Sequence, residues 1–92
     1  MYARVTTANV QPGKMDEAIS MMRDSAYPAN KNQQGFKSAI LLTNPKTGKA
    51  LSITLWETEA GATAQPAANN PATAGLLVSR SVREIFEVSV QV

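Results

Sequence analysis

The side chains that could do chemistry in this 92-residue sequence centre on its single tryptophan. Ser52, Thr54 and Trp56 occupy alternate positions of a β-prone run, so a strand would place all three on one face. An indole beside small side chains leaves space, which is typical of the wall of a ligand cavity, and its N–H is available as a donor. Packing in a core or a subunit interface explains the same pattern. We predict Trp56 and Ser52 as substrate-binding residues, with packing as the alternative for Trp56.

Further candidates lie near the predicted ends of other elements. Asn9 near the end of the first strand offers an amide, although Asn is also common in turns. Tyr27 precedes Pro28 at a predicted helix end and offers a phenol to a pocket mouth, with covering of the sheet edge as the alternative. Arg80 and Arg83 could stabilise a phenolate, or could be solvated surface cations. We predict Asn9 and Tyr27 as substrate-binding residues.

Several kinds of chemistry are excluded by composition, because the chain has no His and no Cys. Ser-His-Asp and Cys-His nucleophiles, disulfides and the usual zinc sites all need those residues. The carboxylate pairs Glu57 with Glu59 and Glu84 with Glu87 do not have the converging oxygens of a hard-cation site. We expect no metal and no cofactor, and the sequence assigns no catalytic residue.

Charge and hydropathy indicate the kind of partner. Nine Lys and Arg against seven Asp and Glu give a net charge of +2, and the cations are scattered. Nucleic acid is therefore not an expected partner. No basic region with an apolar core opens the chain, and no apolar run approaches the roughly 18 residues of a membrane span. We expect one domain over residues 1–92, no membrane association and a cytoplasmic location.

The first half of the chain predicts a strand, a helix and a hairpin. Residues 2–10 are rich in β-branched side chains and end at Pro12 and Gly13. An apolar stripe at helical spacing then predicts a helix that stops at Tyr27, because Pro28 disfavours helical geometry there, followed by a loop over 30–35. The stripe consists of Met15, Ala18, Ile19, Met22 and Ala26. A hairpin follows, in which two strands over 36–43 and 50–57 flank a turn with Asn, Pro and Gly.

The second half predicts a short helix and a last strand. Thr58 could cap a helix that begins at Glu59, and the Gly and Pro residues over 61–75 limit it to short turns. Apolar residues at even positions from Val82 to Val92 predict the last strand. The order is βαββαβ, which predicts an α+β, ferredoxin-like fold with a four-stranded antiparallel sheet and both helices on one face. Because so short a chain buries little surface, we expect a homodimer that pairs two sheets face to face.

Four segments in this order resemble the antibiotic biosynthesis monooxygenase domain. They are Val10-Gln11-Pro12-Gly13-Lys14, Gln34-Gly35-Phe36, Ile53-Thr54-Leu55-Trp56-Glu57-Thr58 and Arg83-Glu84-Ile85-Phe86-Glu87-Val88. The resemblance spans nearly the whole chain and implies a dimeric α+β barrel. It also implies several activities, among them oxygenation of polycyclic phenols without metal or flavin, and oxidative haem degradation.

The resemblance does not select one of these activities. Its haem-degrading members use a helical His as iron ligand, which this chain lacks, so we do not expect haem degradation. Its catalytic members have an amide where this chain has Ser52 and an aromatic where it has Ala62. Three hypotheses remain: a cofactor-independent monooxygenase acting on a small aromatic or quinol-type metabolite, a noncatalytic dimer that binds a small apolar ligand, and an RNA-binding sheet. The third lacks the exposed strand aromatics that RNA-recognition sheets use.

Overall fold

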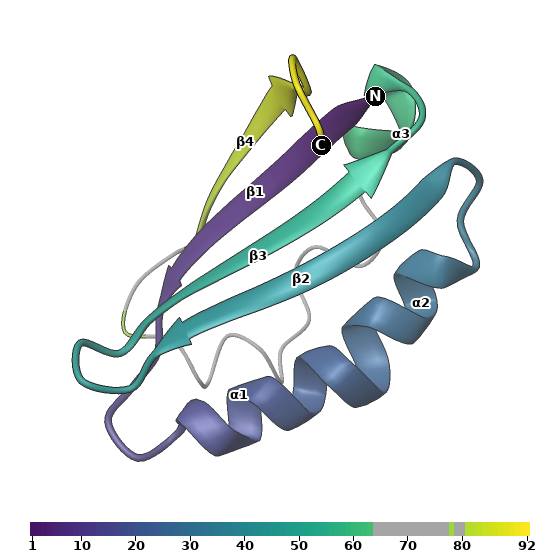
Figure 1. Cartoon of the computed structure of the whole chain (residues 1–92). Helices are drawn as coiled ribbons and strands as arrows, with labels where there is room; N and C mark the ends of the chain where they lie inside the picture. The colour runs from purple at the N-terminus through teal and green to yellow at the C-terminus, as the bar shows by residue number, and fades with distance from the viewer. Residues whose placement is uncertain (64–77, 79–80) are drawn as a thin grey trace.

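The computed structural model describes residues 1–63, 78 and 81–92. Strands and helices alternate in the predicted βαββαβ order, with the first helical region divided into three segments (Figure 1). The elements are β1 (Tyr2–Asn9), α1 (Met15–Met21), the π-helical segment η1 (Met22–Ala26), α2 (Tyr27–Lys31), β2 (Phe36–Asn44), β3 (Lys49–Trp56), α3 (Glu59–Thr63) and β4 (Val82–Glu87).

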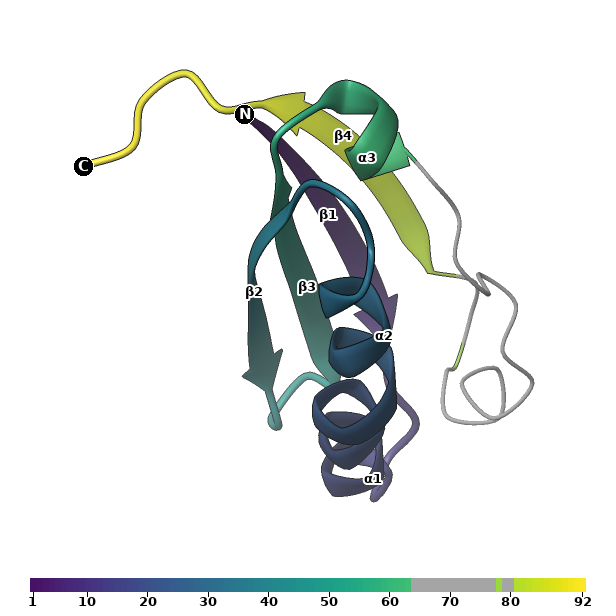
Figure 2. The same cartoon turned by 90° about the vertical axis from the view of Figure 1, so that its right-hand side faces the viewer.

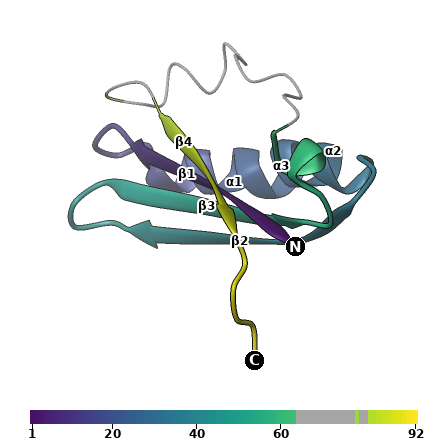
Figure 3. The same ribbon diagram turned by 90° about the horizontal axis from the view of Figure 1, so that it is seen from above.

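The four strands form one antiparallel sheet in the order β2-β3-β1-β4. The described helices all lie on the same side of this sheet, as Figures 2 and 3 show. This arrangement confirms the predicted ferredoxin-like α+β fold. Among the described helices, none has the length and apolar character needed to cross a membrane.

The strand register divides the side chains between two faces of the sheet. Thr6 pairs with Ser52 on β3 and with Arg83 on β4, and Ser52 pairs with Leu41 on β2. Directly opposed residues point to the same face, so these four form one row across the sheet beneath the helices. We call this side the helix face and the other side the open face.

The open face is apolar and lacks a cover from the described helices. Ile40 and Leu42 on β2 are 54% and 49% exposed, and Phe86 on β4 is 49% exposed. Their pairing partners include Ile53 and Leu51, which continue the apolar surface across β3. The hydrophobic core therefore lies on the helix face, and the open face is available for another apolar surface.

The predicted helix end at Tyr27 is wrong, because helical structure continues to Lys31. The π-helical segment explains how the chain passes Pro28. Tyr27 N–H donates to Met22 O, five residues earlier, and Pro28 then occupies the first turn of α2, where its missing N–H costs little. The predicted loop consequently begins after Lys31, and Asn30 is a buried helical residue.

The predicted last strand is too long. It ends at Glu87, which pairs with Tyr2, the first residue of β1. Beyond that pair β1 provides only the carbonyl of Met1, which accepts from Val88 N–H at 2.9 Å. The ladder has no further partner, and the C-terminal residues leave the sheet (Figure 2).

Local turn and capping predictions are confirmed where the structure describes them. Thr58 Oγ1 accepts from Gly61 N–H at 3.0 Å, which caps α3. The hairpin turn closes through Gly48 N–H to Asn44 O at 2.8 Å, with Gly48 in the left-handed region at a φ of 78°. The predicted broken turns after Thr63 lie outside the described residues.

Candidate functional site

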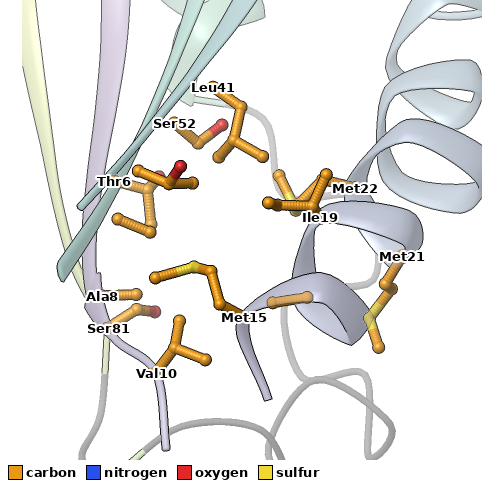
Figure 4. Close-up of a pocket in the computed structure, with 13 residues that line it drawn as sticks. Thr6, Ala8, Val10, Met15, Ile19, Met21, Met22, Leu41, Ser52 and Ser81 are labelled. Atoms are coloured by element: carbon orange, nitrogen blue, oxygen red, sulfur yellow. The ribbon is translucent and has the colours of Figure 1, made fainter. Parts of the chain in front are cut away.

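A cavity lies between α1 and the helix face of the sheet (Figure 4). Its floor includes two neighbouring rows of the sheet, one through Ser52 and Thr6 and one through Ala50 and Ala8. Small side chains in both rows leave the space that a larger residue would fill. The described residues that line it are Thr6, Ala8, Val10, Met15, Ala18, Ile19, Met21, Met22, Leu41, Thr43, Ala50, Ser52 and Ser81.

Helix α1 and the first residue of η1 supply the apolar wall of the cavity. Met15, Ile19 and Met22 follow the spacing of one helix face, as the sequence pattern predicts, and Figure 4 shows them directed toward the strands. Met21 points away from the strands in the same view. Methionine is flexible and polarisable, so this wall suits apolar ligands of varied shape. The volume is about 110 Å³, which is comparable to the roughly 150 Å³ cavity known to take a benzene ring.

A pair of hydroxyl groups connects the cavity to α2. Tyr27 Oη and Ser52 Oγ are 2.9 Å apart, and Tyr27 Oη also lies 3.4 Å from Ile40 O. A carbonyl only accepts, so when Tyr27 donates to Ile40, Ser52 donates to Tyr27. Burial raises the pKa of Tyr27, and the hydrogen bond with Ser52 opposes that rise. Tyr27 is therefore a protonated phenol at neutral pH.

Trp56 is fully buried in a polar and aromatic cluster on the helix face of the sheet. Its indole N–H donates to Thr54 Oγ1 at 2.8 Å, and Phe36 packs edge-on with ring centroids 5.4 Å apart. The guanidinium carbon of Arg4 lies 4.9 Å from the ring centroid, which is a cation–π contact. Trp56 is not among the described residues that line the cavity, so this geometry favours packing for the indole.

Arg4 connects the tryptophan cluster to α2. Its Nε donates to Thr54 Oγ1 at 3.3 Å, and its Nη2 donates to Asn30 Oδ1 at 3.4 Å. Burial, together with the nearby charge of Arg83, lowers the pKa of Arg4 to about 10. The side chain still carries its charge at neutral pH, so a buried positive charge lies beside the row that contains Thr6 and Ser52.

The structure brings two of the four predicted substrate-binding residues together. Ser52 lines the cavity and Tyr27 bonds to it, whereas Trp56 lies four residues further along the same face of β3. Asn9 is exposed, and strand alternation from Ala8 puts it on the open face. The binding roles themselves stay predictions.

Sequence reasoning did not find Thr6 or Arg4. Both alternate with apolar and β-branched neighbours in the first strand. This pattern predicts a strand, but it does not show which strands lie beside it in the sheet. Their contacts depend on the register of β1 against β3 and β4. The sequence did contain one relevant signal. Thr6 and Arg4 are two residues apart in the predicted strand, so alternation places both side chains on the same face.

A second, more open hollow runs along the edge strand β2. Its volume is about 510 Å³, and it shares Ile19, Leu41 and Thr43 with the cavity. Tyr27 lines this hollow and is bonded to Ser52 in the cavity, so the phenol stands between the two spaces. In the part of the chain that the structure describes, no group of three or more His, Cys, Asp or Glu side chains could hold a metal ion.

Comparison with solved structures places the fold among the antibiotic biosynthesis monooxygenases. A monooxygenase from the gene ActVA-Orf6 of Streptomyces coelicolor, in complex with nanaomycin D, has a TM-score of 0.75 at 15% identity, covering 99% of this chain and 89% of that one. The heme-degrader MhuD of Mycobacterium tuberculosis has a TM-score of 0.75 at 24% identity, covering 100% and 99%. A structure named antibiotic biosynthesis monooxygenase has a TM-score of 0.74 at 12% identity, covering 98% and 100%. The resemblance predicted from the sequence is thus confirmed at the level of the fold.

Sequence comparison gives a shorter match. The uncharacterized protein Rv2558 of Mycobacterium tuberculosis is 34% identical over 58 residues, which cover 63% of this chain. The matched residues make up 25% of that protein's length. No family model matches the sequence.

The residues present do not fit haem, which MhuD binds. The chain has no His to serve as the usual proximal ligand. The cavity of about 110 Å³ is also well below the roughly 300–1,000 Å³ of pockets for drug-sized ligands. The site suits a smaller molecule.

Proposed function

We propose that this protein is a cofactor-independent monooxygenase-like protein that acts on a small aromatic or quinol-type metabolite. The observation that supports it is the methionine-lined cavity, whose floor includes Ser52, the hydrogen-bond partner of Tyr27. A ring fits among Met15, Ile19 and Met22, and a ring hydroxyl can bond to the hydroxyl pair. Such a pocket excludes water from the ring while orienting its oxygen.

The proposed reaction needs no external reductant. A quinol can reduce dioxygen itself: one oxygen atom is added to a ring carbon, the other leaves as water, and the quinol becomes a hydroxyquinone. Electron transfer to oxygen is easier from the ring anion, so donors near the developing oxyanion favour it. Ser52 and Thr6 offer hydroxyl groups on the cavity floor, and when the protonated Tyr27 donates to Ser52 Oγ, the Ser52 hydroxyl is left to donate to a ligand oxygen.

A noncatalytic binder of the same ligands is the second candidate function. It is favoured because none of the described residues that line the cavity carries a carboxylate or an amine. Hydroxyl groups are weak bases at neutral pH, so those side chains do not take the proton of a quinol. Under this candidate the cavity stores or transports its ligand unchanged.

Oxygen uptake with a single-ring quinol distinguishes the two functions. We expect uptake by wild-type protein above the rate of quinol alone, unchanged by a metal chelator, and ¹⁸O from ¹⁸O₂ in the hydroxyquinone. Ser52→Ala should lower the rate, while Ser25→Ala, at an exposed position of η1 that lines neither hollow, should not. Saturable binding without uptake would support the binder, and neither binding nor uptake would refute both.

We also propose that the protein works as a homodimer through the open face. The support is the exposed apolar surface around Ile40, Leu42 and Phe86. Light scattering at micromolar concentration should give twice the 9.8 kDa chain mass, and Leu42→Lys should give the single-chain mass. A single-chain mass for wild-type protein would refute the dimer. The cytoplasmic location expected from the sequence stays a prediction, which cell fractionation tests.

A further inference from the structure

The hollow beside β2 lies between a strand edge and one ridge of the helical region. Its helical lining consists of Ile19, Arg23, Tyr27 and Lys31, which recur every four residues. Its other lining residues come from β2, the outer strand of the sheet, and Figure 1 shows the helices running in the opposite direction to this strand. The hollow is therefore a groove that follows β2, and its volume of about 510 Å³ is typical of ligand pockets. We call it the β2 groove.

The outer edge of β2 has backbone groups that an added strand could use. β2 pairs with β3 on one side only, so alternate N–H and C=O groups point away from the sheet. Among the described residues, no backbone group outside β3 bonds to residues 37–43. Protective features are confined to the start of the strand, where a charged residue, Lys37, coincides with a bulge. Residues 38–44 include no charge and no Pro, so most of this edge is open to pairing.

The described lining of the β2 groove includes three cations and no carboxylate. Arg23 pairs with Asp24, and Lys37 pairs with Glu57, in exposed ion pairs that contribute little to stability. All seven Asp and Glu residues belong to the described part of the chain, and none of them forms an ion pair with Lys31. The groove therefore has a positive potential that attracts an anionic partner.

We propose that the β2 groove binds an extended acidic segment of another protein, which joins the sheet as a strand beside β2. Alternate side chains of such a segment lie over the helix face. Apolar ones pack against Ile19 and Leu41 in the groove, and acidic ones meet Arg23 and Lys31. A small anion would leave the strand edge unpaired, and a basic segment would be repelled.

This interaction is separate from the chemistry proposed for the cavity. The groove lies on the helix face, whereas the proposed dimer uses the open face, so both surfaces can be occupied together. A second copy of this chain is a poorer occupant of the groove. Its free edge strand is β4, and pairing β4 with β2 joins copies head to tail, which produces open filaments.

Fluorescence anisotropy with matched peptides tests the charge preference. The probe is a short labelled peptide of alternating glutamate and valine, and the matched probe has glutamine in place of glutamate. We expect the glutamate peptide to bind the full chain about ten-fold more tightly at low salt, with a preference that falls as salt is added. Hydrogen exchange should slow at the outer amides of β2 when this peptide binds, because the added strand accepts from them.

Methylation of alternate backbone nitrogens in the glutamate peptide tests strand pairing. A strand added at an edge uses every second N–H group, so one methylation pattern should abolish binding and the other should be tolerated. Lys31→Glu should weaken binding of the glutamate peptide about five-fold or more and spare the glutamine peptide. Lys46→Glu is the matched control, because Lys46 is exposed in the hairpin turn and lines neither the cavity nor the groove.

Four results would overturn the proposal. They are equal or absent binding of the two peptides, equal effects of the two methylation patterns, unchanged binding in Lys31→Glu, and displacement of the peptide by sulfate at the same concentration. Light scattering supplies a fifth. Growth of the wild-type protein beyond a dimer without peptide would assign the β2 edge to a second copy of this chain.

Discussion

The hydroxyl of Thr54 should be a main source of stability on the helix face, and replacing it with Val tests this. Thr54 Oγ1 accepts from the indole N–H of Trp56 at 2.8 Å and from Nε of Arg4 at 3.3 Å, and Thr54 is only 3% exposed. Thr54→Val keeps the shape and removes the acceptor. A buried donor that loses its partner costs about 1–3 kcal/mol, so the two donors together should cost about 2–6 kcal/mol.

Thermal and urea denaturation measure this cost directly. For a chain of this size about 1 kcal/mol shifts Tm by roughly 4–8 °C, so Thr54→Val should lower Tm by roughly 10 °C or more. The single tryptophan lies in the cluster, so its fluorescence reports unfolding at the altered site. Thr54→Ser is the matched control, because it keeps the oxygen and loses one methyl group, for about 1 kcal/mol. If Thr54→Val were no more destabilising than Thr54→Ser, the hydrogen bonds would not have the assigned role.

Three further outcomes follow from the turns, the cavity and the phenol. Gly13→Ala and Gly48→Ala both place Ala at a φ of 78°, costing about 1–2 kcal/mol in urea denaturation, and Gly48→Ala should cost more, because its Cβ would lie 2.9 Å from Val10 O. Equal costs would contradict that close approach. Titration with haem should give no saturable Soret shift, because the chain has no His, and a shift that saturates at one haem per chain would contradict this. The raised pKa of Tyr27 means that the native state holds this proton to higher pH than the unfolded state, so its contribution lowers stability as pH rises above about 10 and is absent below. Tyr27→Phe should therefore lose less stability at alkaline pH than the wild-type protein does. The measurement is the free energy of unfolding of both proteins at pH 9 and above pH 10. An identical loss of stability in both proteins would contradict the assignment.

Much of the fold could be predicted from the sequence because strong local signals agree. The apolar stripe from Met15 to Met22, the Asn and Gly of the hairpin turn and the Thr58 cap all act over a few residues. The antiparallel topology then follows from the βαββαβ order and the handedness of crossovers. The end of the last strand could not be predicted in this way, because it depends on where its partner β1 begins.

The site was predicted only in part, for a related reason. Alternation within one strand placed Ser52, Thr54 and Trp56 on a common face, and the structure has them there. Which side chains stand opposite them depends on register, so Arg4 and Arg83 could not be related to Ser52. Side-chain size was also misleading. The large Trp56 fills its own space, and the cavity lies where Ala50 and Ala8 leave room.

The placement of Tyr27 shows why a helical period alone could not define the cavity. In a regular α-helix each residue turns about 100°, so Tyr27, eight residues after Ile19, would face about 80° away from it. The π-helical segment between them spreads the chain over a wider turn and reduces this rotation, so Ile19 and Tyr27 both face the sheet. The same segment accommodates Pro28, which has no N–H for a regular helical bond. One irregularity thus allows a single helical region to supply both the apolar wall of the cavity and the phenol that bonds to Ser52 on its floor.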